Sequence, residues 1–217
     1  MDVPGGIKDI PPACVDELGP KEHLPKLSAT DGEPHVMFPA DMILIDGEPE
    51  HLANWRVLCA QGIHVHYHPP RPGWRATQRA KPYVQFERES RYFHIEETLD
   101  FEQALVKFTR YDWAYDHIAA SRCQTNPGFE SVAPNLVFTF VQAELPMIIA
   151  AGRSLNIMDR MVDQFGTGLT VSTNELATLR PRMEAALDKT MKANLRRRRE
   201  FFTFDRAALA LLIMPDL

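Results

Sequence analysis

The sequence predicts a protein of the α/β or α+β class, in which a small mixed sheet precedes a helical C-terminal half. Two observations support this class. Residues 41–68 follow the pattern of a strand, a helix and a second strand, whereas apolar residues after Pro146 recur at helical spacing. Residues 1–40 are rich in proline. We therefore expect an extended arm over 1–40, a mixed α/β core over 41–145, and a helical region over 146–217 that packs on the core or on a partner.

The N-terminal arm contains seven prolines. Proline lacks the backbone donor and fixes φ, so this stretch predicts neither a long helix nor a central strand. An isolated segment of this kind buries too little apolar surface to offset its conformational entropy. Ile7, Ile10 and Leu24 are spaced like contacts along a groove, and we interpret them as interaction residues. The arm is therefore predicted to lie extended across a neighbouring subunit.

The clearest local pattern is a βαβ unit at about residues 41–68. Met42–Ile45 is a short apolar run typical of a buried strand, and Pro49 suits the first turn of a helix. Gly62 is placed to end that helix, and Ile63–His68 then alternates between apolar and polar residues. Short connections between these elements favour parallel strands with a right-handed crossover.

The rest of the core mixes strand and helix patterns. We expect a loop over 69–82, two strands at 83–87 and 91–97, a helix over 101–118, and a strand at 136–141. The strands are predicted from β-branched and aromatic residues, and the helix from apolar residues spaced three and four apart.

The C-terminal region shows helical periodicity only. One helix is expected to begin near Asn174 and to be interrupted at Arg180–Pro181. A short apolar helix over 205–214 has no polar face, so we expect it to dock on the body or on another chain. Leu211 and Leu212 are the residues expected to make that contact.

Three histidines alternate along one predicted strand: His64, His66 and His68. Alternate strand residues share a face, so two of them can reach one metal ion. His94 and Glu96 have the same spacing on a later predicted strand, and neighbouring strands would complete a zinc or iron ligand set. We favour a polar strand face that is solvated or faces a partner, with no metal bound, because no carboxylate closely follows the three histidines.

Motifs for nucleotide binding and nucleophilic catalysis are weak. The loop Asp46–Glu50 lies where an open α/β sheet binds its ligand, but its two glutamates would repel phosphate and instead suit a helix dipole. Neither GxGxxG nor GxxxxGK[ST] occurs in the sequence. Ser154 lacks the second glycine of a nucleophile elbow, and Cys123 near His117 defines no catalytic pair by sequence alone. We expect no cofactor and assign no catalytic residue.

A run of four arginines is followed closely by an aromatic residue. At a helix C-terminus such cations are favoured by the dipole and need no ligand. The mixture of basic and aromatic groups also leaves open a contact with acidic lipid or with RNA. The residues interpreted as this interaction surface are Arg196, Arg197, Arg198, Arg199 and Phe201.

Composition excludes several classes of protein. A net charge of −5 argues against wholesale binding to a nucleic-acid backbone. Three cysteines without a CxxC pair favour a reducing compartment, in the cytoplasm or an organelle interior. The N-terminus resembles neither a signal peptide nor a transit peptide. No apolar run approaches the ~20 residues of a bilayer span, so we expect an intracellular protein without a transmembrane segment.

Together these features favour a non-catalytic structural or accessory subunit, tethered to other protein subunits by its arm and its C-terminal helix. Respiratory-complex subunits, ribosome-associated proteins and virion components share this architecture, and a mitochondrial location stays open. The alternative is a metal-dependent hydrolase that activates water at His64, His66 and His68 with His94 or Glu96.

Overall fold

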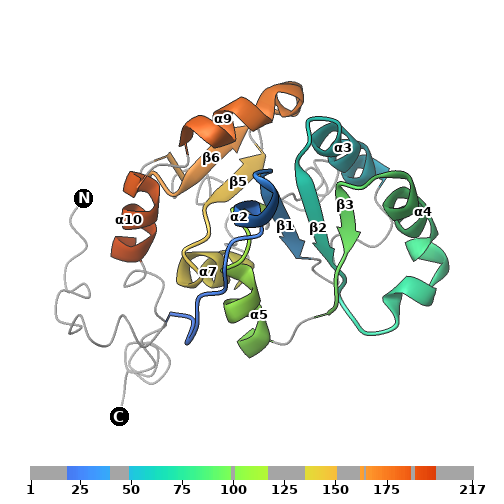
Figure 1. The fold of residues 1–217 in the computed structure, drawn as a ribbon, viewed down its shortest axis with the longest axis horizontal. Helices are drawn as coiled ribbons and strands as arrows, with labels where there is room; N and C mark the ends of the chain where they lie inside the picture. The colour runs from blue at the N-terminus through green and yellow to red at the C-terminus, as the bar shows by residue number, and fades with distance from the viewer. Residues whose placement is uncertain are drawn as a thin grey trace, which may run out of the picture.

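The described residues of the protein form one sheet with helices on both of its faces (Figure 1). The structure is a computed structural model, and it describes residues 19–39, 49–98, 101–116, 135–150, 162–163, 165–186 and 189–198.

Six strands form the sheet in the order β3-β2-β1-β4-β5-β6, and every neighbouring pair is parallel. The first described strand, β1, lies in the middle of the sheet. β2 and β3 extend the sheet to one edge, and β4, β5 and β6 then form the other half. The order reverses between β1 and β4, where open α/β sheets form a crevice at their carboxyl ends. The α/β class is confirmed, with a parallel rather than mixed sheet in the described residues. The strands are β1 (His35–Pro39), β2 (His64–His68), β3 (Phe93–Ile95), β4 (Trp113–Asp116), β5 (Met147–Ala150) and β6 (Gly168–Val171).

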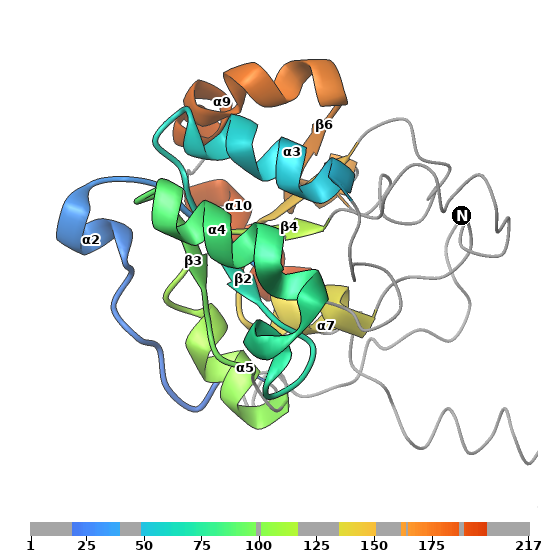
Figure 2. The same cartoon turned by 90° about the vertical axis from the view of Figure 1, so that its right-hand side faces the viewer.

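Helices cover the two faces of the sheet in separate groups. On one face, Tyr67 of β2 contacts Trp55 and Tyr83, which belong to α3 and α4; Figure 2 shows these two helices in front of the strands. On the other face, His68 contacts Phe108 of α5, and Phe108 contacts Phe140 of α7. The helices are α2 (Ser28–Asp31), α3 (Pro49–Cys59), α4 (Lys81–Glu89), α5 (Phe101–Phe108), α7 (Asn135–Gln142), α9 (Leu179–Ala186) and α10 (Lys189–Arg198), with 3₁₀ turns at Trp74–Ala76, Gln78–Ala80 and Thr173–Thr178.

The expected βαβ unit is present, but its first strand in the described residues lies earlier in the chain. α3 begins at Pro49, and Gly62, with a φ of 73°, supplies the left-handed residue after it. β2 pairs in parallel with β1, which lies in the proline-rich segment where no central strand was predicted. Pro39 is the last residue of β1, so its missing donor costs little there. The run Met42–Ile45 lies outside the described residues.

Two segments predicted as strands are helices. α4 includes 83–87, and α7 includes 136–141. In α4, Tyr83 and Phe86 are buried three residues apart while Gln85 between them is exposed, which is helical spacing. Short apolar runs do not distinguish a strand from a buried helix, and tertiary packing decides between them.

Two segments predicted as helix are strands, and a third strand lies in the C-terminal region that was predicted to be helical. β4 begins at Trp113, inside the helix expected over 101–118, and β5 and β6 lie in the region expected to be helical throughout. Strands buried on both faces lose the polar alternation that identifies them, and Ile148 and Ile149 are both buried. The later helix is present as α9 and α10, but the interruption predicted at Arg180–Pro181 is wrong, because Pro181 lies in the first turn of α9, where proline is tolerated.

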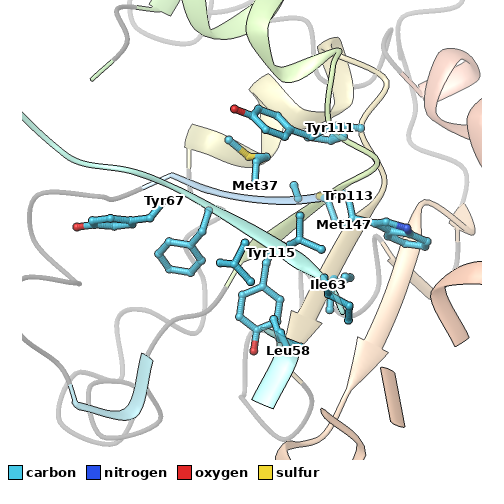
Figure 3. Close-up of a cluster of buried hydrophobic side chains, with 14 of the residues drawn as sticks. Met37, Leu58, Ile63, Tyr67, Tyr111, Trp113, Tyr115 and Met147 are labelled. Carbon is cyan, nitrogen blue, oxygen red and sulfur yellow. The ribbon is translucent and has the colours of Figure 1, made fainter. Parts of the chain in front are cut away.

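Side chains alternate between the two faces of the central strands (Figure 3). Tyr115 lies on the face toward α3, whereas Met37 lies on the opposite side of β1, near Tyr111. On the α3 face, Trp55 is the centre of an aromatic cluster. Its ring centroid lies 4.9 Å from Phe38, 5.1 Å from Tyr67 and 5.4 Å from Phe93.

The segment before β1 packs against the body of its own chain. The Leu24 backbone N–H donates to Thr109 Oγ1 at 2.9 Å, and the His35 backbone N–H donates to Asp112 Oδ2 at 2.9 Å. Residues 19–39 therefore do not lie across a neighbouring subunit as predicted, because β1 is a central strand; residues 1–18 lie outside the described residues. In the part of the chain that the structure describes, no helix combines the length and apolar character needed to cross a bilayer.

Candidate functional site

A cavity of about 360 Å³ lies at the carboxyl ends of β2 and β3. This edge of a parallel sheet is where α/β proteins bind ligands, because the connecting loops gather there. Segments 40–48 and 117–134, which follow β1 and β4, lie outside the described residues. The cavity is lined by Pro69, Arg71, Pro72, Gly73, Trp74, Arg75, Ile95, Glu96, Glu97 and Thr98.

Cations and carboxylates share the lining of this cavity. Arg75 is held in place, since Nη1 donates to the Ile95 carbonyl at 3.0 Å and Nη2 contacts Glu87. Arg71 is exposed, and in the described residues no hydrogen bond or ion pair joins its side chain to another group. Glu96 stays ionised, because its hydrogen bond with His66 lowers the pKa of the carboxyl group to about 2. The cavity thus offers a free guanidinium beside hydrogen-bond acceptors.

The three alternating histidines are buried rather than solvated or partner-facing, so that part of the prediction is wrong. His64, His66 and His68 have exposed fractions of 9%, 5% and 5%. Residues 31–35 and 108–112 contribute the groups that contact this face of β2. The predicted alternation is confirmed, because Val65 and Tyr67 are buried on the other side.

One chain of hydrogen bonds crosses this face of the sheet; we call it the first histidine chain. Asp31 Oδ2 lies 3.1 Å from His35 Nε2, and His35 Nδ1 lies 2.8 Å from His66 Nε2. His66 Nδ1 then lies 2.6 Å from Glu96 Oε1, at the wall of the cavity. Burial lowers the pKa of His66 to about 4, so a neutral imidazole is favoured at neutral pH.

A second histidine chain runs beside the first. Glu33 Oε2 lies 2.8 Å from His64 Nε2, and His64 Nδ1 lies 2.8 Å from His94 Nε2. The rings of His35 and His64 stack, with centroids 4.4 Å apart and planes inclined by 6°. His68 belongs to neither chain, because Nε2 bonds to the Tyr111 hydroxyl at 2.9 Å.

The structure brings together most of the predicted metal candidates, but as hydrogen-bonded partners. β2 and β3 are neighbours as required, and His66 is in register with His94. The carboxylates that the sequence seemed to lack come from Asp31 and Glu33, which precede β1. Gly32 between them has a φ of 75°, and this turn places both carboxylates at the start of the strand. Asp31 and Glu33, together with His35, were missed because they are about 30 residues from the other histidines.

The predicted interaction residues are only partly described. Leu24 packs on its own chain, and Arg196 Nε donates to Glu144 Oε2 at 2.8 Å. Arg197 is exposed at the end of α10. A contact with acidic lipid or RNA at this helix end stays a prediction. Outside the described residues or side chains lie Ile7, Ile10, Arg198, Arg199, Phe201, Leu211 and Leu212.

Comparison with known proteins shows similarity of fold. No family model and no curated protein matches the sequence. Among solved structures, WaaG, a glycosyltransferase involved in lipopolysaccharide biosynthesis, matches with a TM-score of 0.57 at 10% identity, over 91% of this chain and 53% of its own. HepE from Anabaena, in complex with UDP and glucose, has a TM-score of 0.57 at 11% identity, over 96% and 53%. The catalytic domain of starch synthase IV from Arabidopsis thaliana, bound to ADP and acarbose, has a TM-score of 0.53 at 14% identity, over 94% and 40%.

The chain spans about half of the length of these solved structures or less. At such identities the likeness concerns the fold alone. It nevertheless contradicts the interpretation of this chain as a non-catalytic structural or accessory subunit of a respiratory complex, a ribosome or a virion. That interpretation depended on a free proline-rich arm, and the last part of the supposed arm is a central strand.

Proposed function

We propose that this chain is a nucleotide-binding domain of a glycosyltransferase and that it takes a nucleoside diphosphate sugar at the carboxyl edge of its sheet. The observation that carries the proposal is the similarity of fold to WaaG and HepE, together with a cavity at the carboxyl edge of the parallel sheet. HepE was solved with UDP, and starch synthase IV with ADP. The chemistry common to the two ligands is a nucleoside diphosphate.

The lining of the cavity suits such a ligand. A guanidinium presents several donors in one plane and pairs well with phosphate oxygens, so we assign diphosphate recognition to the exposed Arg71. The sequence has no glycine-rich phosphate motif, which makes a side-chain cation the available means. Glu96 and Glu97 are acceptors at the end of β3, and we assign them to ribose hydroxyls, which a carboxylate binds in dinucleotide-binding sheets.

The proposed reaction is the transfer of a sugar to an acceptor hydroxyl. The acceptor oxygen forms a bond to the anomeric carbon while the bond from that carbon to the diphosphate breaks, and the hydroxyl proton passes to a base. A cation beside the diphosphate stabilises the negative charge that develops on it. Because the solved neighbours are about twice as long, a second domain would bring the acceptor to this edge.

Isothermal titration of the chain with UDP and ADP tests the proposal. We expect saturable binding of at least one nucleotide, and Arg71→Ala should weaken it about tenfold, as expected for one charge-assisted hydrogen bond. The matched control is Arg88→Ala, because Arg88 is an exposed arginine of α4 that is not among the cavity residues.

Uridine and adenosine separate the contributions of the two ends of the ligand. The Arg71→Ala variant should bind uridine and adenosine as the parent does if Arg71 contacts only the diphosphate. Absence of binding by every nucleoside diphosphate, or an equal loss in the Arg71 and Arg88 variants, would contradict the proposal.

A further inference from the structure

The first histidine chain contains one proton too few. Its three hydrogen bonds each need a hydrogen, but two neutral imidazoles supply two and the carboxylates supply none. If His66 Nδ1–H donates to Glu96, then His66 Nε2 accepts from His35 Nδ1–H. His35 Nε2 is left with a lone pair, although it faces the Asp31 carboxylate at 3.1 Å. A positive charge is therefore missing between His35 and Asp31.

The second histidine chain brings another ring nitrogen to the same place. His64 Nε2 lies 2.8 Å from Glu33 Oε2 and 3.5 Å from Asp31 Oδ2. Two neutral imidazoles satisfy the two hydrogen bonds of this chain only when His64 Nε2–H donates to Glu33 and His94 Nε2–H donates to His64 Nδ1, so an ion at His64 Nε2 would take the place of that proton. At the amino ends of β1 and β2, two imidazole nitrogens thus converge with two carboxylates.

We propose that these groups form a binding site for one divalent transition-metal ion, with zinc as the reference ion. The ligands are His35 Nε2, His64 Nε2 and a carboxylate oxygen of Asp31, and Glu33 Oε2 is the fourth. The ligand atoms of the first three lie within 4.8 Å of one another. His35 Nε2 and His64 Nε2 lie 3.1 and 3.5 Å from Asp31 Oδ2, close to the separation of about 3.3 Å between ligands at ~2.0–2.1 Å from a tetrahedral ion. The two stacked rings, whose planes are inclined by 6°, must tilt toward each other to direct both lone pairs at one ion.

The surrounding residues complete the arrangement that a metal site requires. With the ion on both Nε2 atoms, His35 and His64 donate their Nδ1–H groups to His66 and His94, and the hydrogen-bond directions of both chains become consistent. Such outer partners hold the ligand rings in orientation and in the correct tautomer. The ion also supplies the missing positive charge. A mixed imidazole and carboxylate set suits zinc and its neighbours in the first transition row.

The position of the site separates it from the proposed nucleotide cavity. It lies at the amino ends of the strands, whereas the cavity lies at their carboxyl ends. The side chains of Asp31 and Glu33 are 37% and 23% exposed, so the ion has access from solvent. Arg91 and the Tyr92 hydroxyl bond to Glu33 Oε1, which leaves Oε2 for the metal. A bound ion would join the turn before β1 to β2. This effect does not depend on any transferase activity.

Zinc titration of the full chain, after treatment with a chelator, tests the proposal. Isothermal titration with zinc chloride should give one ion per chain, and cobalt(II) in its place should show the visible absorption of a tetrahedral ion. Asp31→Asn should weaken zinc binding at least about tenfold, since even outer partners contribute that much. His64→Gln should have the same effect.

His23→Gln is the matched control, because His23 is an exposed histidine of the same N-terminal segment and should leave zinc affinity unchanged. Asp31 is itself exposed, so its variant keeps the test valid if His64→Gln does not fold. No saturable binding near one ion per chain would show that a proton fills the gap instead of a metal. Equal zinc affinity of the Asp31→Asn variant and the parent would equally overturn the site.

Discussion

The two faces of β1, β2 and β3 are built from alternate residues of the same strands, yet different interactions stabilise them. One face carries the aromatic cluster around Trp55, which contacts Phe38, Tyr67 and Phe93. The other carries the two histidine chains. Apolar burial is roughly proportional to area and has no direction, so the aromatic face depends on volume and fit. The histidine face depends on the position of each hydrogen, because a buried polar atom without a partner is costly.

This difference shows which face of the sheet can carry a functional site. The aromatic face lies under α3 and α4, and its centre is made of aromatic rings. The histidine face is open to three carboxylates from two segments, namely Asp31 and Glu33 before β1 and Glu96 after β3. The proposed metal site depends on imidazoles whose other nitrogens are held by neighbouring side chains.

The largest effect is expected on the aromatic face. Trp55→Ala should lower the free energy of unfolding by about 3–5 kcal/mol, because it leaves a cavity in the core. Urea denaturation measures the loss. Trp55→Phe should cost much less, since it keeps a ring and removes the indole N–H, which has no hydrogen-bond partner among the described residues. Val57→Ala, at an exposed position of α3, should change stability by less than about 0.5 kcal/mol. Equal losses in the Trp55→Ala and Val57→Ala variants would refute the assigned role of Trp55.

On the histidine face, a smaller loss is expected from breaking one hydrogen bond. His68→Leu conserves much of the volume but leaves the buried Tyr111 hydroxyl without its partner at 2.9 Å, which should cost about 1–3 kcal/mol. Adding Tyr111→Phe removes the second partner and should recover part of the loss. A double-mutant cycle by urea denaturation measures this coupling. Strictly additive losses would mean that the two side chains do not interact.

The smallest expected effect is a dependence of stability on pH. Burial lowers the pKa of His68, so the folded protein holds this ring neutral while the unfolded chain takes up a proton near the ordinary value of 6.5. Stability from this group is therefore complete above pH 6.5 and is lost as the pH falls toward the lowered folded pKa. The parent should lose more stability between pH 7 and pH 5 than His68→Leu does, as measured by denaturation at both values. Parallel pH profiles would show that His68 does not titrate differently on folding.

Much of the fold could be predicted from local pattern, and the failures have a common cause. α3 was predicted from Pro49 and Gly62, which act through backbone geometry that neighbouring residues do not change. The runs 83–87 and 136–141 were assigned to strands because a short apolar run is compatible with a strand and with a buried helix. In the first run, the burial of Tyr83 and Phe86 three residues apart shows the helix. β5 was assigned to a helix because a strand buried on both faces has no polar alternation.

By itself the sequence determined the α/β class, the alternation that puts His64, His66 and His68 on one face, and the absence of a glycine-rich phosphate motif. These features are local, and backbone geometry is enough to interpret them. Only the tertiary structure decided that His35 meets His64 and His66, that Asp31 and Glu33 supply carboxylates, and that a cavity opens at the other end of the same strands. The physical reason is that parallel strands are joined by crossovers of a dozen or more residues, so groups that touch across the sheet are about 30 residues apart in the chain.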